Sequence, residues 1–155
     1  KYDENMAEVI ARHQAACCLM QNREQIDYTD YVEDVLDDLR ESVQIAKAAD
    51  IPDDRIMLDP GVGFGKTYEM NLEIIRVVGR LKELGYPVLL GTSRKSVIGL
   101  TLDLPADQRE EGTLVTTVLG VEQGCSFVRV HDVETNARAI RMAEAIFREH
   151  DLAVR

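Results

Sequence analysis

The residues best suited to chemistry lie in a glycine-rich segment, residues 59–66, which reads D-P-G-V-G-F-G-K. Asp59 ends the short apolar strand expected at residues 55–59, and a strand followed by such a loop commonly builds a ligand site in α/β proteins. The segment nearly matches the phosphate-binding pattern G-x-x-x-x-G-K-[ST], but Pro60 replaces its first glycine and has no N–H to offer a phosphate. The dinucleotide fingerprint also fails, because Lys66 occupies its last glycine position. We therefore predict a ligand loop; the plainer alternative is a tight turn that Asp59 merely caps.

A second polar cluster, formed by Ser93, Arg94, Lys95 and Ser96, follows another apolar run. Hydroxyl groups and cations in this position suit a ligand with anionic or carbonyl oxygens. Because Arg94 and Lys95 point to different sides, one of them can enter a cleft while the other meets solvent or an acidic partner. A solvated charge pair is the alternative interpretation.

A third cluster contains Arg129 and His131, which stand two residues apart at the end of a predicted strand. Residues i and i+2 of a strand share a face, so both side chains are expected to point into the mouth of the fold. A guanidinium group beside an imidazole suits an anion. A structural ion pair between Arg129 and Asp59 is the alternative.

The elements that must position these clusters follow one rhythm of strand, loop and helix. A helix near residues 3–13, with Asp3 as its N-cap, precedes four such units. Asp30 and Glu33 are expected to cap the second helix as a capping box, and Gly85 to end the third. The last helix is expected to bury Ala139, Met142, Ala143 and Ile146. The strands are predicted at residues 15–20, 55–59, 87–90 and 126–130, and the helices after them near residues 31–49, 69–84, 106–123 and 134–149.

Continuous apolar strands indicate a parallel α/β sheet that is covered on both faces. All three clusters follow strands, so they are expected at one edge of that sheet, where such folds bind ligands. Four units fit either a doubly wound sheet or part of a (β/α)8 barrel. Since a whole barrel needs about 250 residues, a chain of 155 residues would be a partial one, with residues 1–155 forming a single partial domain.

Composition excludes several classes of function. A formal net charge of −10 argues against nucleic acid or an anionic membrane as the main partner. No apolar run approaches the roughly 18 residues of a membrane helix. Cys17, Cys18 and Cys125 are interpreted as buried, reduced thiols of a cytoplasmic protein, and the three histidines show no zinc-type spacing.

Taken together, the segments 58–66, 91–99 and 129–133 closely resemble dihydropteroate synthase in sequence, order and spacing. The resemblance covers essentially the whole chain. It implies a TIM barrel of which this chain is the second half, strands five to eight with their helices, plus the preceding helix. It also implies an enzyme that condenses 6-hydroxymethyl-7,8-dihydropterin diphosphate with p-aminobenzoate, giving 7,8-dihydropteroate and pyrophosphate in folate biosynthesis.

The resemblance also implies roles for individual residues. Asp59 would accept hydrogen bonds from the pterin edge, and Lys95 would donate to the pterin ring. Arg129 and His131 would bind the diphosphate and stabilise the leaving group. The remaining substrate contacts implied are apolar surface from Met20 and Phe64, and a hold on the aminobenzoate carboxylate by Ser96 with the start of the helix after its loop.

Further implications concern cofactors and partners. Mg²⁺ would accompany the diphosphate, with its protein ligand outside this chain, and sulfonamides would act as inhibitors. The late helices would form a homodimer. One departure is that Gln21 follows Met20, where the family usually has His. The first four strands, which carry the rest of the site, are absent, so the chain alone is expected to be inactive.

Two other functions stay open on the sequence. A pterin-binding methyltransferase domain is a related barrel, but it would not need the second cluster beside an Arg-x-His pair aimed at a diphosphate. A non-catalytic barrel fragment, kept for dimerisation or structure, would be favoured if Asp59, Lys95, Arg129 and His131 were scattered or turned into the core.

Overall fold

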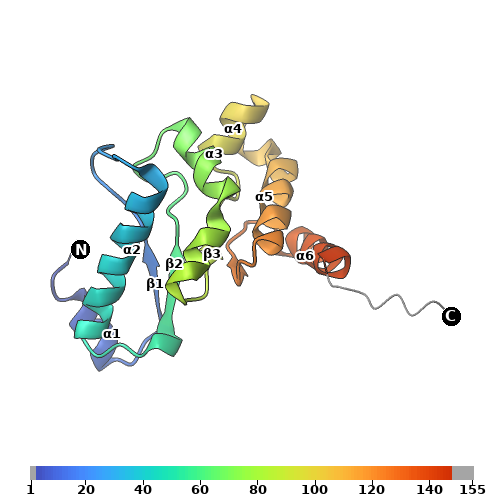
Figure 1. The fold of residues 1–155 in the computed structure, drawn as a ribbon. Coiled ribbons are helices and arrows are strands. Elements are labelled where there is room, and N and C mark those ends of the chain that lie inside the picture. Colours follow the sequence, from blue (N-terminus) through green and yellow to red (C-terminus); the bar gives the residue numbers. More distant parts are fainter. Residues whose placement is uncertain (1–2, 148–155) are drawn as a thin grey trace.

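The computed structural model describes residues 3–147 and confirms the alternation of strands and helices. Figure 1 shows the chain passing through its elements in sequence order, with the helices gathered in front of the strands. The elements in order are α1 (Met6–Arg12), β1 (Cys17–Met20), α2 (Tyr31–Ala48), η1 (Asp53–Arg55), β2 (Ile56–Asp59), α3 (Tyr68–Arg76), η2 (Val78–Leu84), β3 (Leu89–Leu90), α4 (Ser96–Leu102), η3 (Ala106–Gln108), α5 (Glu110–Glu122), β4 (Phe127–Val128) and α6 (Val133–Phe147).

The strands pair in parallel, as predicted, in the order β1-β2 and β3-β4. A parallel bridge between Leu58 and Val88 joins the two pairs, and the N–H of Leu58 donates to the carbonyl of Pro87 at 2.9 Å. Met20 stands opposite Asp59 in the register of β1 and β2. The carboxyl ends of all four strands therefore reach the same edge, where the predicted clusters begin.

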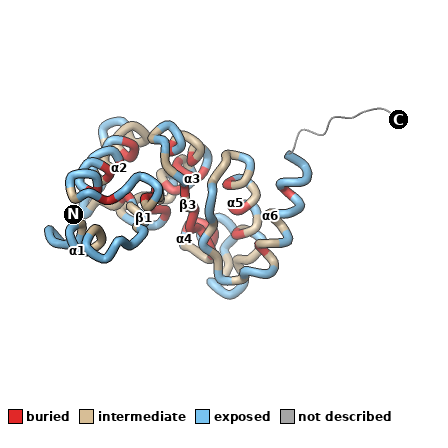
Figure 2. The backbone as a smooth tube through the Cα atoms, turned by 90° about the horizontal axis from the view of Figure 1, so that it is seen from below, coloured by how far each residue is buried: buried red, intermediate tan, exposed pale blue. Residues whose placement is uncertain are grey.

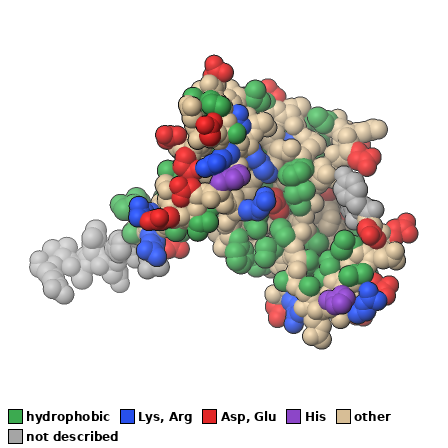
Figure 3. Space-filling view, turned by 180° about the vertical axis from the view of Figure 1, so that it is seen from behind, with side chains coloured by type: hydrophobic (Ala, Val, Ile, Leu, Met, Phe, Trp, Pro, Cys, Tyr) green, Lys and Arg blue, Asp and Glu red, His purple; other side chains and the backbone are tan. Residues whose placement is uncertain are grey.

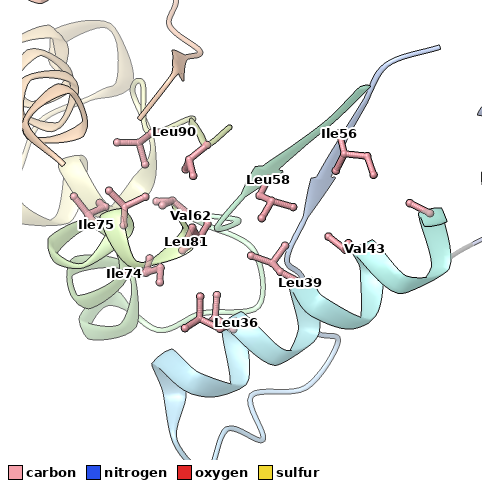
Figure 4. Close-up of a cluster of buried hydrophobic side chains, with 14 of the residues drawn as sticks. Leu36, Leu39, Val43, Ile56, Leu58, Val62, Ile74, Ile75, Leu81 and Leu90 are labelled. Atoms are coloured by element: carbon pink, nitrogen blue, oxygen red, sulfur yellow. The ribbon is translucent and has the colours of Figure 1, made fainter. Parts of the chain in front are cut away.

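The hydrophobic core lies between the strands and the helices that follow them. In Figure 4, Leu39 on α2 points toward Leu58 on β2, and Leu36 lies farther along the same helix. All three side chains are completely buried. Leu81 on η2 and Leu90 on β3 continue this core into the next unit. Periodic apolar residues on the helices and alternating ones on the strands thus form one aliphatic layer.

The other face of the strands is not covered within residues 3–147. Side chains alternate along β1, so Cys17 packs against the core while Cys18 is exposed on the opposite face. Met20 and Phe127 are also exposed, at 38% and 48%. The prediction of strands covered on both faces is therefore wrong for this chain, and so is the prediction that Cys18 is buried. A sheet with helices on one side matches part of a barrel wall rather than a doubly wound sheet.

Three predicted loop and helix boundaries are wrong. The third helix breaks after Arg76 and continues as the 3-10 helix η2, ending at Gly85 with a φ of +83° as predicted. The predicted loop 91–99 ends early, because α4 starts at Ser96 and buries Val97 and Ile98. The fourth helix begins as the separate turn η3 before α5.

The predicted N-caps do not form as expected. Asp30 occupies the N-cap position of α2, but its side chain makes no capping hydrogen bond. Asp34 instead accepts the N–H of Thr29 at 2.7 Å, and Glu33 pairs with Arg80 at 2.8 Å. At α1 the N-cap is Asn5 rather than Asp3. The carboxylates near the starts of α1 and α2 therefore accept hydrogen bonds from donors other than the expected helix N–H groups.

Helix α6 is the element that departs most from expectation. Figure 2 shows α6 at the edge of the molecule with little buried surface beyond its contact with α5. Ala143 is buried, at 3% exposure, but Met142 and Ile146 are each 62% exposed. The predicted burial of those two side chains is therefore wrong, and Ala139 is only partly buried. The predicted last residues of this helix, 148 and 149, lie outside the described residues.

Candidate active site

The candidate site is the strand edge where residues after β2, β3 and β4 meet. Asp59 ends β2, Lys95 follows β3 and Arg129 follows β4. A side chain added at Gly91 would lie 3.9 Å from Oδ2 of Asp59 and 3.8 Å from Cβ of Arg129. Gly91 therefore lies close to both groups, which places Asp59 and Arg129 near each other at this edge. Figure 3 shows one face of the molecule on which Lys and Arg side chains gather beside a histidine.

Asp59 is held in the mouth by its own loop. Its Oδ1 accepts the N–H of Gly61 at 2.7 Å, so Asp59 caps the turn, while its other oxygen, Oδ2, takes no part in this cap. Burial raises the pKa of Asp59, while that hydrogen bond and the nearby cations Lys95, Lys66 and Arg129 lower it. The result is a partly buried carboxyl group whose second oxygen, Oδ2, could accept hydrogen bonds from a ligand.

Lys95 reaches from the second loop to the glycine segment. Its Nζ donates to the carbonyl of Val62 and lies 4.8 Å from the ring centroid of Phe64, a cation–π distance. Burial lowers the pKa of Lys95, and Arg129 lowers it further, whereas Asp59 raises it. Lys95 thus enters the cleft, as one of the two neighbouring cations was expected to do, and Phe64 keeps 41% of its surface exposed beside it.

Ser93, Arg129 and His131 share one small pocket of about 100 Å³, which Lys95 also lines. The hydroxyl of Ser93 lies 2.8 Å from Nδ1 of His131 and accepts the backbone N–H of the same residue at 3.2 Å. Which atom donates in the contact between Ser93 and Nδ1 depends on the tautomer of His131. The contact holds the imidazole ring in place and leaves Nε2 as the ring nitrogen that a ligand can reach.

The remaining predicted site residues lie nearby but differ in surroundings. Met20 stands beside Asp59 in the sheet and is 38% exposed, so it offers apolar surface at the mouth. Ser96 is exposed at the first position of α4. The four residues Asp59, Lys95, Arg129 and His131 are neither scattered nor turned into the core, which is the arrangement that a site requires.

Sequence reasoning missed Arg109, which holds the second loop from behind. Its guanidinium donates to the carbonyls of Leu104, Arg94 and Lys95 at 2.8, 2.9 and 3.4 Å. Arg94 has a left-handed backbone with a φ of +58°, which is unusual for arginine and must be held by its surroundings. No motif marks Arg109, because its acceptors are backbone carbonyls whose positions only the fold reveals.

Within residues 3–147, no group of three or more His, Cys, Asp or Glu side chains could hold a metal ion. No helix in the same range is both long and apolar enough to cross a membrane. The three cysteines are free thiols.

Comparison with known proteins gives the family. The pterin binding enzyme family matches residues 1–131. A dihydropteroate synthase from Clostridium beijerinckii is 55% identical over 149 residues, which make up 96% of this chain and 55% of that protein. The chain therefore spans about half the length of this relative.

Solved structures give the same result. A dihydropteroate synthase from Clostridium difficile, crystallised with pteroic acid, superposes with a TM-score of 0.93 at 47% identity, over 96% of this chain and 57% of that one. A dihydropteroate synthase from Thermus thermophilus, in complex with 6HMPPP, gives a TM-score of 0.87 at 36% identity, over 94% and 58%. The fold is thus that of part of these barrels, and the chain belongs to the pterin-binding enzyme family.

Proposed function

We propose that this chain forms the carboxyl-terminal half, strands five to eight, of a barrel with dihydropteroate synthase activity. The reaction joins 6-hydroxymethyl-7,8-dihydropterin diphosphate to p-aminobenzoate and releases pyrophosphate. The observation that carries the proposal is the meeting of Asp59, Lys95, Arg129 and His131 at one edge, in a chain 55% identical to a dihydropteroate synthase. In this proposal the chain alone is inactive, because the other strand ends of the barrel are needed to complete the site.

The pterin would lie between the apolar surfaces of Met20 and Phe64. Asp59 would accept hydrogen bonds from the adjacent N–H and amino groups of the pterin, since a carboxylate matches such a pair of donors. Lys95 would leave the carbonyl of Val62 and donate to a ring oxygen or nitrogen. Its lowered pKa reflects a desolvated ammonium, and a hydrogen-bond acceptor on the ligand would stabilise it.

Arg129 and His131 would act on the leaving group. In the proposed step the bond between the pterin methylene carbon and the diphosphate oxygen breaks, and its electron pair stays on the diphosphate. The guanidinium of Arg129 and the Nε2–H of His131 would stabilise that growing charge. The neutral amine of p-aminobenzoate then attacks the carbon and loses a proton, while Ser96 would hold its carboxylate.

Mg²⁺ would reach this site with the diphosphate, a common pairing for phosphate substrates. Among residues 3–147 no cluster of ligands suits a metal ion, so protein ligands for Mg²⁺ would come from the other half of the barrel. The residues of this chain would bind the organic part of the substrate and the outer oxygens of the diphosphate.

A homodimer is the proposed assembly, formed through the late helices. Helices α3, α4 and α5 border an apolar groove of about 680 Å³ that includes Val115 and Leu119, which are 61% and 37% exposed. Exposed aliphatic side chains beside a groove could pack against a second copy of the barrel. Val115→Glu is expected to shift the complete barrel from dimer to monomer in light scattering; an unchanged mass would argue against this groove as the interface.

A hybrid barrel tests the proposed activity. In it, this chain replaces the matched residues of the Clostridium beijerinckii protein. The hybrid is expected to form 7,8-dihydropteroate, with inhibition by a sulfonamide, and pyrophosphate is expected to promote binding of p-aminobenzoate. Methyl transfer from a methylated folate by the hybrid, without this activity, would favour the methyltransferase alternative.

Matched variants locate the activity in this chain. Asp59→Asn is expected to lower kcat/KM of the hybrid by about 100-fold, the effect of weakening a pair of charged hydrogen bonds. Asp54→Asn, at an exposed carboxylate on the opposite edge, should leave it unchanged. A folded but inactive hybrid would contradict the proposal, as would full activity in Asp59→Asn. Turnover by the 155-residue chain alone would contradict the need for the other half.

A further inference from the structure

We propose that Gln21 and Lys66 form a strut that positions Phe64, making both of them positioning residues for the aromatic wall of the site. The role of that wall rests on the proposed function, whereas the strut itself rests on contacts among Gln21, Asp38, Lys66 and the glycine loop. Lys66 ends the glycine-rich segment 59–66 but has no role in the proposed reaction.

Gln21 anchors one end of the strut immediately after β1. Its N–H donates to the carbonyl of Asp59 at 3.0 Å, and its side chain is only 2% exposed. Its Nε2 donates to Oδ2 of Asp38 at 2.8 Å and contacts the hydroxyl of Tyr28 at 3.1 Å. Because a carboxylate only accepts hydrogen bonds, the amide orientation is fixed, and Oε1 must face the other way, toward Lys66.

The anchor is itself held by a charged network. Arg23 donates to the carboxylate of Asp38 through Nε at 2.7 Å and through Nη2 at 3.2 Å. The guanidinium also lies 4.6 Å from the ring centroid of Tyr28, whose hydroxyl donates to the carbonyl of Gly65 at 3.3 Å. Two sets of contacts therefore connect this network to the glycine loop. One runs from Asp38 through Gln21 to Lys66, and the other runs from Arg23 through Tyr28 to the carbonyl of Gly65.

Lys66 forms the other end of the strut. Its Nζ donates to Oε1 of Gln21 and to the carbonyl of Phe64, the latter at 3.1 Å. Burial lowers the pKa of Lys66 to about 8, although Asp59 raises it. Lysine usually keeps its ammonium in water, so an ammonium held inside the loop at this cost indicates a structural use for its hydrogen bonds.

The strut holds the backbone of Phe64, whereas Lys95 contacts its ring. Lys95 contacts the ring of Phe64 and the carbonyl of Val62, but it is also the proposed pterin donor, so a ligand would compete for it. Lys66 instead binds the backbone of Phe64 and an amide of the protein. The contact through Lys66 is therefore the one that can persist when the site is filled.

Position 21 needs a side chain that donates to a carboxylate on one side and accepts from an ammonium on the other. Glutamine meets both needs at any pH, and histidine meets them only while its ring is neutral. Leucine has a similar size and meets neither. Gln21→Leu and Gln21→His therefore separate the hydrogen bonds of the strut from the volume of the side chain.

Hydrogen exchange in the 155-residue chain tests the strut directly. The reporters are the N–H groups of Gly63 and Phe64, which bind Asn71 and Gly61. Gln21→Leu and Lys66→Met are each expected to speed their exchange about tenfold, as for the loss of one charge-assisted hydrogen bond. The N–H of Leu58, bound to Pro87 in the sheet, should be unaffected, and Gln21→His should exchange as wild type at pH 8.

Kinetics of the hybrid barrel supply a second readout. Gln21→Leu and Lys66→Met are expected to raise KM for the pterin substrate about tenfold while inhibition by pyrophosphate changes less than about twofold, because the strut supports the pterin wall and not the diphosphate pocket. Unchanged exchange at Gly63 and Phe64 in both variants would overturn the proposal. Equal acceleration at Leu58 would overturn it too, since the pair would then only stabilise the whole fold.

Hydrogen exchange tests the strut, and kinetics of the hybrid barrel also test the proposed function, so the two proposals can fail independently. An inactive wild-type hybrid would count against the proposed function, yet the exchange experiment would still decide whether Gln21 and Lys66 position the loop. Lys66→Met guards against misfolding of Gln21→Leu, because Lys66 is only partly buried whereas Gln21 is inside the fold.

Discussion

The first and last units of the chain share one pattern but differ in burial. Helix α2 places Leu36 and Leu39 against β1 and β2, and both side chains are completely buried. Helix α6 has the same spacing of apolar residues, yet Met142 and Ile146 remain 62% exposed. The helical pattern thus predicts which face of a helix can be buried, whereas burial itself depends on whether a neighbouring element is present.

The last unit is held largely by polar contacts with α5. The side chain of Asn136, 1% exposed, donates to Oε1 of Glu110 at 2.7 Å and accepts from the hydroxyl of Thr117 at 2.7 Å. Buried hydrogen bonds of this kind fix one orientation but add less stability than an aliphatic core. The first unit is therefore expected to dominate the stability of the chain, and four measurements can test that ranking.

The largest effect is expected from the first unit. Leu39→Ala should lower the free energy of unfolding by about 2–5 kcal/mol, because it removes a completely buried side chain. Met142→Ala, the matched change in the last unit, should cost no more than about 0.5 kcal/mol. Urea unfolding measures both. Equal losses would mean that α6 is buried in solution by another surface.

A smaller loss is expected in the third unit, where Arg109 holds the loop after β3. Arg109→Met removes three hydrogen bonds to backbone carbonyls, so the free energy of unfolding should fall by about 1.5–3 kcal/mol. Arg109→Lys should recover only part of this, because one ammonium cannot span the same acceptors. If Arg109→Lys restored the full free energy of unfolding, the three hydrogen bonds of the guanidinium would not be the cause of the loss.

The next smaller loss of stability is expected at the buried hydrogen bonds that Asn136 of α6 makes with Thr117 and Glu110. Asn136→Ala leaves Thr117 and Glu110 without their buried partner and should cost about 1–3 kcal/mol. Thr117→Val removes only one of these bonds and should cost less, and the two changes should not be additive because they share a contact. Additive losses in urea unfolding would show that Asn136 acts through volume alone.

The smallest effect concerns Lys66, a partly buried cation of the second unit that binds Gln21 of the first unit. The pKa of Lys66 is lowered to about 8 in the fold, from an ordinary value of 10.5. Between these pH values the unfolded chain binds more protons than the folded one, so the contribution of Lys66 to the free energy of unfolding rises with pH. The difference between wild type and Lys66→Met should therefore grow in favour of wild type from pH 8 to 10.5. A constant difference would indicate an ordinary lysine.

Local patterns predicted the four strands, most helices and the meeting of Asp59, Lys95, Arg129 and His131, because a parallel sheet brings its strand ends together. They did not predict that α4 starts at Ser96. Only two apolar residues, Val97 and Ile98, follow the polar cluster there, and so short a run does not distinguish a helix from a loop. Arg109 was missed for a related reason. Its partners are backbone carbonyls, which sequence does not distinguish from one another.

Other errors concern a helix cap that does not form and a helix face that has no neighbouring element. Asp30 was expected to cap α2, but its side chain makes no capping hydrogen bond, whereas Asp34 accepts the N–H of Thr29 in the preceding loop. Met142 and Ile146 were expected to be buried because the pattern assumes that every apolar face has a partner. The glycine pattern did predict a turn capped by Asp59, but only the fold shows Lys66 bound to Gln21.

The register that sets Met20 opposite Asp59 has a consequence for how this segment can change during evolution. Leu58 faces the helices and Asp59 faces the mouth, so deleting one residue from β2 would exchange their faces. A carboxylate would then enter the aliphatic core and a leucine would enter the site. Substitutions can change the side chains of this strand, but a change in its length would abolish folding and ligand binding together. Insertions and deletions should therefore be confined to the loop before β2, away from the site.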